Sequence, residues 1–464
     1  MAIEERHWQT DGDSNISPRR ATWRGRRVTA ETQALLDEDA RYFLHQSLST
    51  PCLSAVAKAE GIWIEDFDGR RYMDFHGNNV HHIGYGHPRL VAAIKAQLDA
   101  LTFAPRRFTN EPAIALARKL TEITPGPLEK VLLATGGSDA IEIALKLARL
   151  KTGRHKTISF WDSFHGAGFA ASSVGGEDTF RSGPIGPLMA GTEHVPPFSC
   201  YRCPYGYEDI DGKPDLDTCH MTCANMLRYV LEKEGDVAAV IAEPIRSISY
   251  VPPPGFWQSV REACDEYGAL LIFDEIPAGL GKTGRMFVYE HFDVVPDILV
   301  LGKPLGGGVL PISAVIARSE LDVGGNWALG HYTHEKNPVT SAAALTTIEI
   351  IEDEGLVENA RVVGAYALDL LEAMKSRHPL IGDVRGLGLL LGVELVQDRE
   401  SKSPACDAAE AVMYRCLDKG LSFKTTLGNV LALTPPLITT VADMDYAVAI
   451  LDAAIGEVEA DRRV

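Results

Sequence analysis

The middle of the chain alternates between two hydrophobic patterns. Apolar side chains recur every three or four positions over residues 89–101 and 112–123, which predicts two helices. Short, largely apolar runs then follow at four places, KVLLAT (130–135), VAAVIAE (237–243), ALLIFDE (269–275) and DILVLGK (297–303). Such runs of valine, isoleucine and leucine are typical of strands in a parallel sheet that helices cover on both faces.

The two ends of the chain show other patterns. Residues 28–48 predict an acidic amphipathic helix, and residues 61–75 alternate around a central Asp-Gly turn, which predicts a β-hairpin. Near the C-terminus the pattern predicts helices over 338–354 and 356–376 and a strand within 381–396. Together these elements predict an α/β protein whose large domain holds a mainly parallel sheet and whose smaller domain is α+β.

Changes between these patterns predict the domain organisation. The expected parts are an N-terminal arm and helix (1–50), the N-terminal part of a small domain (51–85), a large domain (86–345) and the C-terminal small domain (346–464). Within the first part, the basic stretch RRATWRGRR (19–27) indicates an exposed arm, because the acidic residues before it argue against a transit peptide.

Composition narrows the range of partners. The 464-residue chain has a formal charge of −18, which disfavours nucleic acid and anionic membranes but is compatible with a small anionic substrate. No apolar run approaches the ~20 residues that span a bilayer. Eight cysteines in 464 residues are too sparse for a disulfide framework, so we expect a cytoplasmic protein.

Four of the cysteines show a regular spacing. Cys200 and Cys203 form a C-x2-C pair, and Cys219 and Cys223 form a C-x3-C pair fifteen residues later. This spacing is compatible with a zinc site, but four reduced thiols in a surface excursion are the alternative. We predict no metal site.

Polar residues stand at the ends of the predicted strands. Thr135, Glu243, Asp274 and Lys303 all do so, and ligands of open α/β sheets bind at the carboxyl ends of strands. Asp274 follows four apolar residues and should be buried, where its carboxylate needs a protonated pyridine nitrogen or a magnesium ion as partner. Burial also favours the neutral form of a lysine such as Lys303, and the neutral amine is the form that makes Schiff bases.

Two further stretches indicate a cradle for a phosphorylated ring. TGGSDA (135–140) joins a strand to a helix, so Gly137 and Ser138 are candidates for phosphate binding, with a capped turn without ligand as the alternative. Phe164 in SFHGAGFA could stack on a planar ring or pack in the core. Taken in order with Asp274 and Lys303, these features describe a pyridoxal 5′-phosphate site.

The sequence resembles the class III aminotransferases over about residues 50–450. The matching motifs are GIWIEDFDGRRYMDF (61–75), GYGHP (84–88), GGSDA (136–140), FHG (164–166), AEP (242–244), DEI…GLGKTGR (274–285), LGKPLGGGVLPISA (301–314) and T…NP (333–338). The resemblance implies the fold type I architecture of pyridoxal-phosphate enzymes and a homodimer whose subunits share their active sites.

The resemblance also implies a role for each site residue. Lys303 would hold the cofactor covalently and Asp274 would pair with its pyridine nitrogen. The other expected cofactor contacts are Phe164 and Ile276 on the two ring faces, Gly137 and Ser138 at the phosphate, Thr333 from the second subunit, and Glu243 in the AEP motif.

The chain departs from the family pattern where substrate specificity is set. Family aminotransferases have an arginine before the PPL motif that holds the α-carboxylate, whereas Ala432 stands there. Pro277 also replaces a usual glutamine. The candidate substrate-binding residues are instead Arg106, Arg107, Arg246 and Asn78, although the arginines could simply pair with acidic side chains.

Because guanidinium groups bind phosphate or phosphonate, these departures favour the lyases of the family, which act on phosphorylated or phosphonate amines. A transaminase is the alternative. In the expected reaction Lys303 removes a proton beside the amine, a leaving group departs from the next carbon, and ammonia is released. Either His82 or His165 could protonate a leaving hydroxyl.

Overall fold

A computed structural model describes residues 17–46, 49–50, 52–181, 183–186, 188–207, 215–247 and 249–462. The chain divides into two compact units. Unit 1 comprises Met1–Gly77, Gly84–Gly86 and Asn359–Val464, and unit 2 comprises Asn78–Ile83 and His87–Glu358. This division into two units does not test the domain boundaries expected at residues 50, 85 and 345, which stay predictions.

Unit 2 is built on a seven-stranded sheet in the order β4-β10-β9-β8-β7-β5-β6. Its strands are β4 (Leu128–Ala134), β5 (Lys156–Phe160), β6 (Thr192–Val195), β7 (Val237–Ala242), β8 (Leu270–Asp274), β9 (Ile298–Leu301) and β10 (Ser313–Arg318). Strand β10 pairs antiparallel with both β4 and β9, and the pairs among β5 to β9 are parallel. The mainly parallel sheet is therefore confirmed, as are the four predicted strands β4, β7, β8 and β9.

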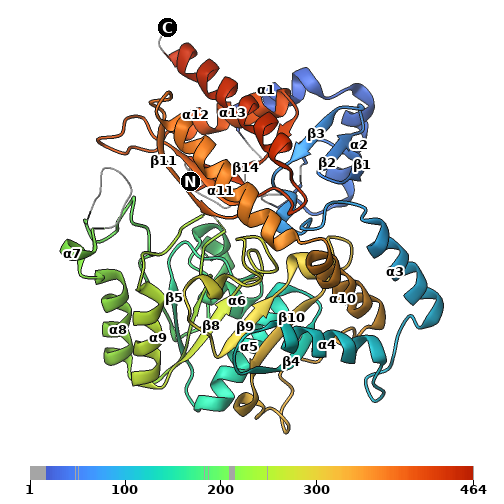
Figure 1. The fold of residues 1–464 in the computed structure, drawn as a ribbon, viewed down its shortest axis with the longest axis vertical. Coiled ribbons are helices and arrows are strands. Elements are labelled where there is room, and N and C mark those ends of the chain that lie inside the picture. Colours follow the sequence, from blue (N-terminus) through green and yellow to red (C-terminus); the bar gives the residue numbers. More distant parts are fainter. Residues whose placement is uncertain are drawn as a thin grey trace. The chain divides into compact units, whose positions relative to one another are not determined.

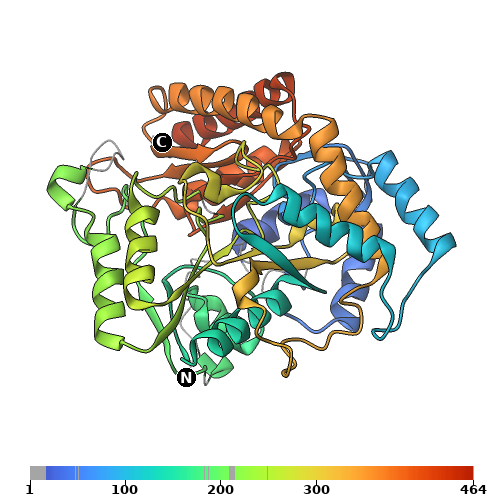
Figure 2. The ribbon, with the colours of Figure 1, turned by 60° about the horizontal axis from the view of Figure 1, so that its bottom comes forward.

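The helices of unit 2 pack on this sheet or on one another (Figure 1). They are α3 (Pro88–Ala100), α4 (Glu111–Ile123), α5 (Gly137–Thr152), α6 (Phe169–Val174), α7 (Leu216–Cys219), α8 (Thr222–Glu234), α9 (Phe256–Tyr267) and α10 (Pro338–Asp353). Helix α5 buries Ile141, Ala144 and Ala148 in the core with Ile272 of β8 and Val300 of β9. Helix α10 packs along α3 and α4 (Figure 2).

Unit 1 contains two four-stranded sheets. The first is ordered β1 (Val56–Glu60), β2 (Trp63–Asp66), β3 (Arg71–Asp74), β13 (Leu421–Ser422), and the second β11 (Ile381–Leu387), β12 (Leu390–Leu395), β15 (Val430–Leu433), β14 (Lys424–Thr426). The predicted hairpin is confirmed as the antiparallel pair β2 and β3. The expectation of one strand within 381–396 was wrong, because the chain reverses at Gly388, with φ 55°, to pair β11 with β12.

The remaining helices belong wholly or mostly to unit 1. They are α1 (Pro18–Arg27), α2 (Ala30–Tyr42), α11 (Leu356–Lys375), α12 (Cys406–Asp418) and α13 (Val441–Arg462). The basic stretch 19–27 is not an exposed arm as expected, because it forms α1 and buries Trp23 to 2% exposure against Tyr414 of α12. Within the described residues, each helix is too short or too polar to cross a membrane.

Candidate functional site

The predicted catalytic pair stands at the carboxyl ends of two neighbouring strands of unit 2. Asp274 ends β8 and Lys303 follows β9, and the two strands pair in parallel with Asp274 opposite Val300. Lys303 begins a short 3-10 helix (Lys303–Gly306) with φ 37°, in the left-handed region that side chains rarely adopt. The expectation that Lys303 is buried was wrong for the single chain, because its side chain extends beyond the buried residues Pro304 to Gly306 and is exposed. Backbone strain of this kind concentrates at functional sites.

The Asp274 carboxylate is held from two sides. It is 2% exposed, its Oδ2 lies 2.8 Å from Nδ1 of the buried His165, and its Oδ1 accepts the backbone N–H of Ile276 at 3.1 Å. Because a carboxylate accepts, Nδ1 of His165 carries the hydrogen. The Nε2 atom of His165 has no hydrogen-bond partner among the described residues. The arrangement fixes a buried anion that is suited to pairing with a protonated ring nitrogen.

The start of α5 has the geometry of an anion-binding helix start, and phosphate binding by Gly137 and Ser138 stays a prediction. Gly136 is the N-cap of this 16-residue helix, and Gly137 and Ser138 occupy its first turn, where backbone N–H groups lack helical partners. The Oγ of Ser138 accepts the backbone N–H of Ala167 at 3.0 Å. A Cβ atom on Gly166, whose φ is 126°, would lie 2.4 Å from that Oγ, so the FHG loop fits closely onto the helix start.

Ile276 occupies the space between two glycines of the site. A Cβ atom on Gly137 would lie 2.9 Å from Cδ1 of Ile276, and one on Gly302 would lie 3.2 Å from its Cγ2. Ile276 is therefore brought beside both the phosphate cradle and the residue that precedes Lys303. A flat apolar wall next to an anion site is what a phosphorylated planar ring requires.

Phe164 and Glu243 are joined through the backbone. One carboxylate oxygen of Glu243 accepts the N–H of Phe164 at 3.2 Å, and the other accepts that of Ser247 at 3.2 Å. The Phe164 ring lies 4.6 Å from that of Phe180, tilted by 54°. Glu243 therefore positions the loop that carries Phe164.

Arg246 is 4% exposed and forms ion pairs with Glu243 and Glu177, each at 3.7 Å. The pairing with Glu243 expected as the alternative is thus present. A buried cation between two carboxylates is largely neutralised, and a contact of Arg246 with substrate stays a prediction.

The other predicted substrate and phosphate residues lie at the surface of unit 2. Arg106 and Arg107 are exposed on the connection between α3 and α4, and neither forms an ion pair within the described part of the chain. Asn78 is exposed with φ 47°, and Thr333 is exposed on the connection between β10 and α10. The structure of one chain does not bring these side chains into the cluster around Asp274.

His82 is fully buried near cationic side chains. Its Nε2 lies 3.1 Å from the carbonyl oxygen of Gly279, so Nε2 carries the hydrogen, and Nδ1 has no hydrogen-bond partner among the described residues. Burial, reinforced by the charge of the buried Lys282, lowers the pKa of His82 well below its ordinary value. His82 is therefore a neutral acceptor at Nδ1, which speaks against a role as proton donor.

Neither metal alternative gains support from the side chains. The four cysteines of the regular spacing are half-buried, and none forms a disulfide within the described residues. Among the described residues, no group of three or more His, Cys, Asp or Glu side chains is arranged to hold a metal ion.

Sequence reasoning assigned no role to a second buried acid, Glu275, beside the site. Glu275 accepts the backbone N–H groups of Val288 at 2.7 Å and Tyr289 at 2.8 Å, while burial raises its pKa to about 8. Its position directly after Asp274 at a buried strand end was the available signal.

A buried carboxylate fixed by a histidine, a strand-end lysine and a helix-start anion cradle define the site of a fold type I pyridoxal-phosphate enzyme, and these residues fit that cofactor. The family model of the class III aminotransferases matches residues 45–455. The chain belongs to this family, so it is a pyridoxal-phosphate-dependent enzyme of the predicted fold.

Individual relatives carry several activities. The chain is 47% identical to the (R)-1-hydroxy-2-aminoethylphosphonate ammonia-lyase of Vibrio splendidus (strain 12B01), covering 98% of this chain and 97% of that protein. It is 39% identical to the leucine/methionine racemase of Thermococcus litoralis, covering 93% and 97%.

Solved structures agree on the fold and the cofactor. A Bacillus anthracis aminotransferase superposes with a TM-score of 0.85 at 33% identity, covering 92% of this chain and 99% of that one. An amine transaminase of an uncultivated Pseudomonas species, solved in its PLP-bound form, gives 0.83 at 31% identity, covering 90% and 99%.

Proposed function

We propose that the protein is a lyase that converts (R)-1-hydroxy-2-aminoethylphosphonate to phosphonoacetaldehyde and ammonia. The observation that carries the proposal is the 47% identity, over 98% of the chain, to a protein with that activity. The second support is Ala432, which is 1% exposed on β15 between Gly392 and Lys424 on the neighbouring strands. This position lacks the arginine with which family aminotransferases hold an α-carboxylate.

The proposed elimination balances without a second substrate. The carbon that bears the amine loses a proton, and the hydroxyl on the next carbon leaves as water. The resulting enamine takes up water and releases ammonia, which leaves the aldehyde. When bound, the cofactor supplies an electron sink for the carbanion.

Lys303 and Asp274 have different roles in the proposed reaction. The Lys303 amine removes the proton as general base and then carries it at Nζ, next to the reacting carbons. Lys303 can return that proton to the leaving hydroxyl, because His165 directs its Nδ1–H to Asp274 and His82 offers only an acceptor at Nδ1. Asp274, held by His165 and the Ile276 N–H, would pair with the protonated ring nitrogen of the bound cofactor.

Substrate recognition and assembly complete the proposal. Arg106, Arg107 and Asn78 are candidates to bind the phosphonate, together with Arg246 if its ion pairs rearrange. We also propose a cytoplasmic homodimer in which Thr333 of one subunit reaches the phosphate of the other. The exposure of Arg106, Arg107 and Thr333 in a single chain is compatible with that assembly.

The test is to supply the hydroxy-aminoethylphosphonate to the holoenzyme without any oxo acid and to measure ammonia and aldehyde. Multiple turnovers are expected, with none in the Lys303→Ala variant. A single turnover that requires an oxo acid to continue would identify an aminotransferase, the second candidate, which the solved relatives favour. Ethanolamine phosphate, offered in parallel, tests for a phospho-lyase by release of inorganic phosphate.

A further inference from the structure

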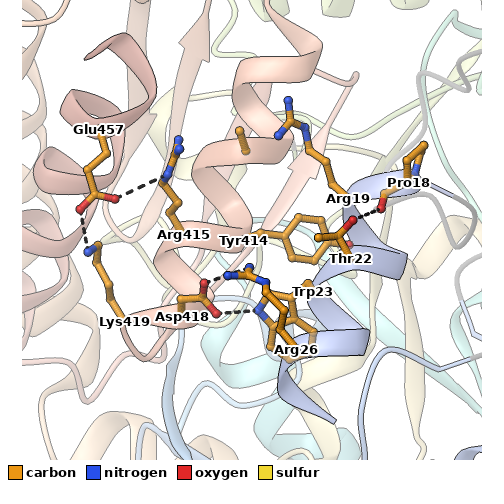
Figure 3. A pocket seen from close by; sticks show the side chains of 11 residues that line it. Pro18, Arg19, Thr22, Trp23, Arg26, Tyr414, Arg415, Asp418, Lys419 and Glu457 are labelled. Carbon is orange, nitrogen blue, oxygen red and sulfur yellow. Dashed lines mark hydrogen bonds and ion pairs between the residues drawn. The ribbon is translucent and has the colours of Figure 1, made fainter. Parts of the chain in front are cut away.

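A pocket lies within unit 1, whereas Lys303 belongs to unit 2. Helices α1, α12 and α13 surround a cavity of about 420 Å³, which is within the usual range for small-ligand sites (Figure 3). Its lining residues are Pro18, Arg19, Thr22, Trp23, Arg26, Ala411, Tyr414, Arg415, Asp418, Lys419 and Glu457. The sequence had marked the basic stretch of α1, but the proposed reaction leaves that stretch unused.

The lining is cationic in a chain of formal charge −18. Four cationic side chains line the cavity against two carboxylates, and each carboxylate is shared. Asp418 pairs with Arg26 at 3.4 Å and with Arg27 at 2.6 Å. Glu457 pairs with Arg415 at 3.5 Å and with Lys419 at 2.8 Å. Arg415 also pairs with Asp461, and Arg19 pairs with Glu410. Among the described residues around the cavity, the five cations Arg19, Arg26, Arg27, Arg415 and Lys419 therefore share four carboxylates, which leaves one positive charge in excess.

Arg19 is the least neutralised of these cations. Its ion pair with Glu410 spans 3.9 Å, and its side chain is 49% exposed. It also lies in the first turn of α1, at the positive end of the helix dipole, and that turn contains no acidic residue. A cation at this position is unfavourable unless an anion comes close to it.

The cations that line the cavity come from two helices, α1 and α12. Arg19 and Arg26 lie seven positions apart on α1, which places them on one helix face. Arg415 and Lys419 lie four positions apart at the end of α12, on the other wall (Figure 3). Two cationic walls that face each other suit an oxyanion with several acceptor oxygens.

The floor between these walls is rigid. Trp23 and Tyr414 are buried with ring centroids 6.2 Å apart, and the indole N–H of Trp23 donates to Asp418 at 2.9 Å. The two rings are 2% and 5% exposed, so they present only a small aromatic surface beneath the charged group. Little side-chain entropy is lost at such a preorganised floor when a ligand binds.

We propose that this cavity is a binding site for a phosphate or phosphonate dianion, with the guanidinium groups of Arg19 and Arg26 as its principal contacts. The ligand is either free inorganic phosphate or a small organophosphonate. The site is separate from the chemistry at Lys303, and it does not depend on the proposed reaction.

The test is calorimetric titration of the holoenzyme with inorganic phosphate and, separately, with methylphosphonate. The Arg19→Ala/Arg26→Ala variant should bind about tenfold to a hundredfold more weakly, since each guanidinium contributes charge-assisted hydrogen bonds. Arg19→Lys/Arg26→Lys should show a smaller loss, because lysine keeps the charge but not the bidentate geometry. Tighter binding of methylphosphonate than of phosphate would identify the organic ligand as the one that the aromatic floor selects.

The matched control is Arg377→Ala in the same unit. Arg377 is also exposed, at 55%, and paired with one acid, Asp452 at 2.6 Å, but it does not line the cavity. Its removal should leave affinity unchanged, and far-ultraviolet circular dichroism should show that every variant is folded. Equal affinity of wild type and Arg19→Ala/Arg26→Ala, or absence of saturable binding to wild type, would overturn the proposal.

Discussion

Replacement of His165 by phenylalanine tests how the buried carboxylate is held. Phenylalanine keeps the planar shape of the ring but removes the Nδ1–H that reaches Asp274 at 2.8 Å. Among the described residues, the carboxylate then keeps only the Ile276 N–H as a donor, at 3.1 Å. A buried hydrogen bond to a charged group contributes about 1.5–3 kcal/mol. If the ring nitrogen depends on this orientation, the cofactor dissociation constant should rise about 10- to 150-fold.

The assay is titration of the apoprotein with pyridoxal phosphate, followed by absorbance of the lysine-bound cofactor. His165→Gln retains an amide donor and should recover part of the affinity. His194→Phe is the matched control, because His194 lies in the same unit but bonds the carbonyl oxygen of Gly175 at 2.9 Å. Cofactor affinity of His165→Phe equal to that of wild type would refute the argument that His165 positions Asp274.

Three further changes probe the site and the fold. Gly166→Ala places a Cβ atom 2.4 Å from Oγ of Ser138, so cofactor affinity should fall at least about tenfold. Unchanged affinity in the same titration would show that the loop carrying Gly166 moves aside without disturbing the site. Glu275 has a folded pKa of about 8, raised by burial from 4.5, so the folded state binds its proton more tightly than the unfolded chain does. Stability of the wild type should therefore fall as pH rises from 4.5 towards 8, relative to Glu275→Gln, in thermal unfolding at each pH; parallel profiles would contradict this assignment. Trp23→Ala removes a 2%-exposed side chain and its bond to Asp418, so α1 should be destabilised by about 3–5 kcal/mol. Limited trypsin digestion should then cleave α1 much faster than in wild type, and an equal rate would count against the packing.

The hydrophobic pattern of the sequence was sufficient to predict those strands whose burial shows in consecutive residues. The strands β7, β8 and β9 were found because both of their faces are buried, which leaves uninterrupted apolar runs. The edge strand β4 exposes Glu129 and Lys130, but the apolar residues that follow them were enough to predict it. The strands β5, β6 and β10 were missed. TEHV of β6 lies at the sheet edge and carries polar residues, so it gives no such run. The β11–β12 hairpin was missed because its strands are continuous in hydrophobicity across the turn at Gly388.

Contacts between distant residues were decided only by the tertiary structure. His165 and Asp274 are 109 positions apart, and Trp23 and Asp418 are 395 apart, so no periodicity links them. The sequence around Arg246 reads the same whether its side chain binds a substrate or pairs with acids. Only the folded structure shows that Arg246 lies between Glu177 and Glu243 and pairs with both.

The sequence by itself determined the family, the strands β7, β8 and β9 of the parallel sheet and the polar residues at strand ends, because burial patterns and motifs are carried by a few neighbouring positions. The tertiary structure decided which polar groups meet: Asp274 with His165, Ile276 between Gly137 and Gly302, and the cationic walls around Trp23. The physical reason is that hydrogen bonds and ion pairs require distances of a few ångströms, which only the folded chain sets for residues far apart in sequence.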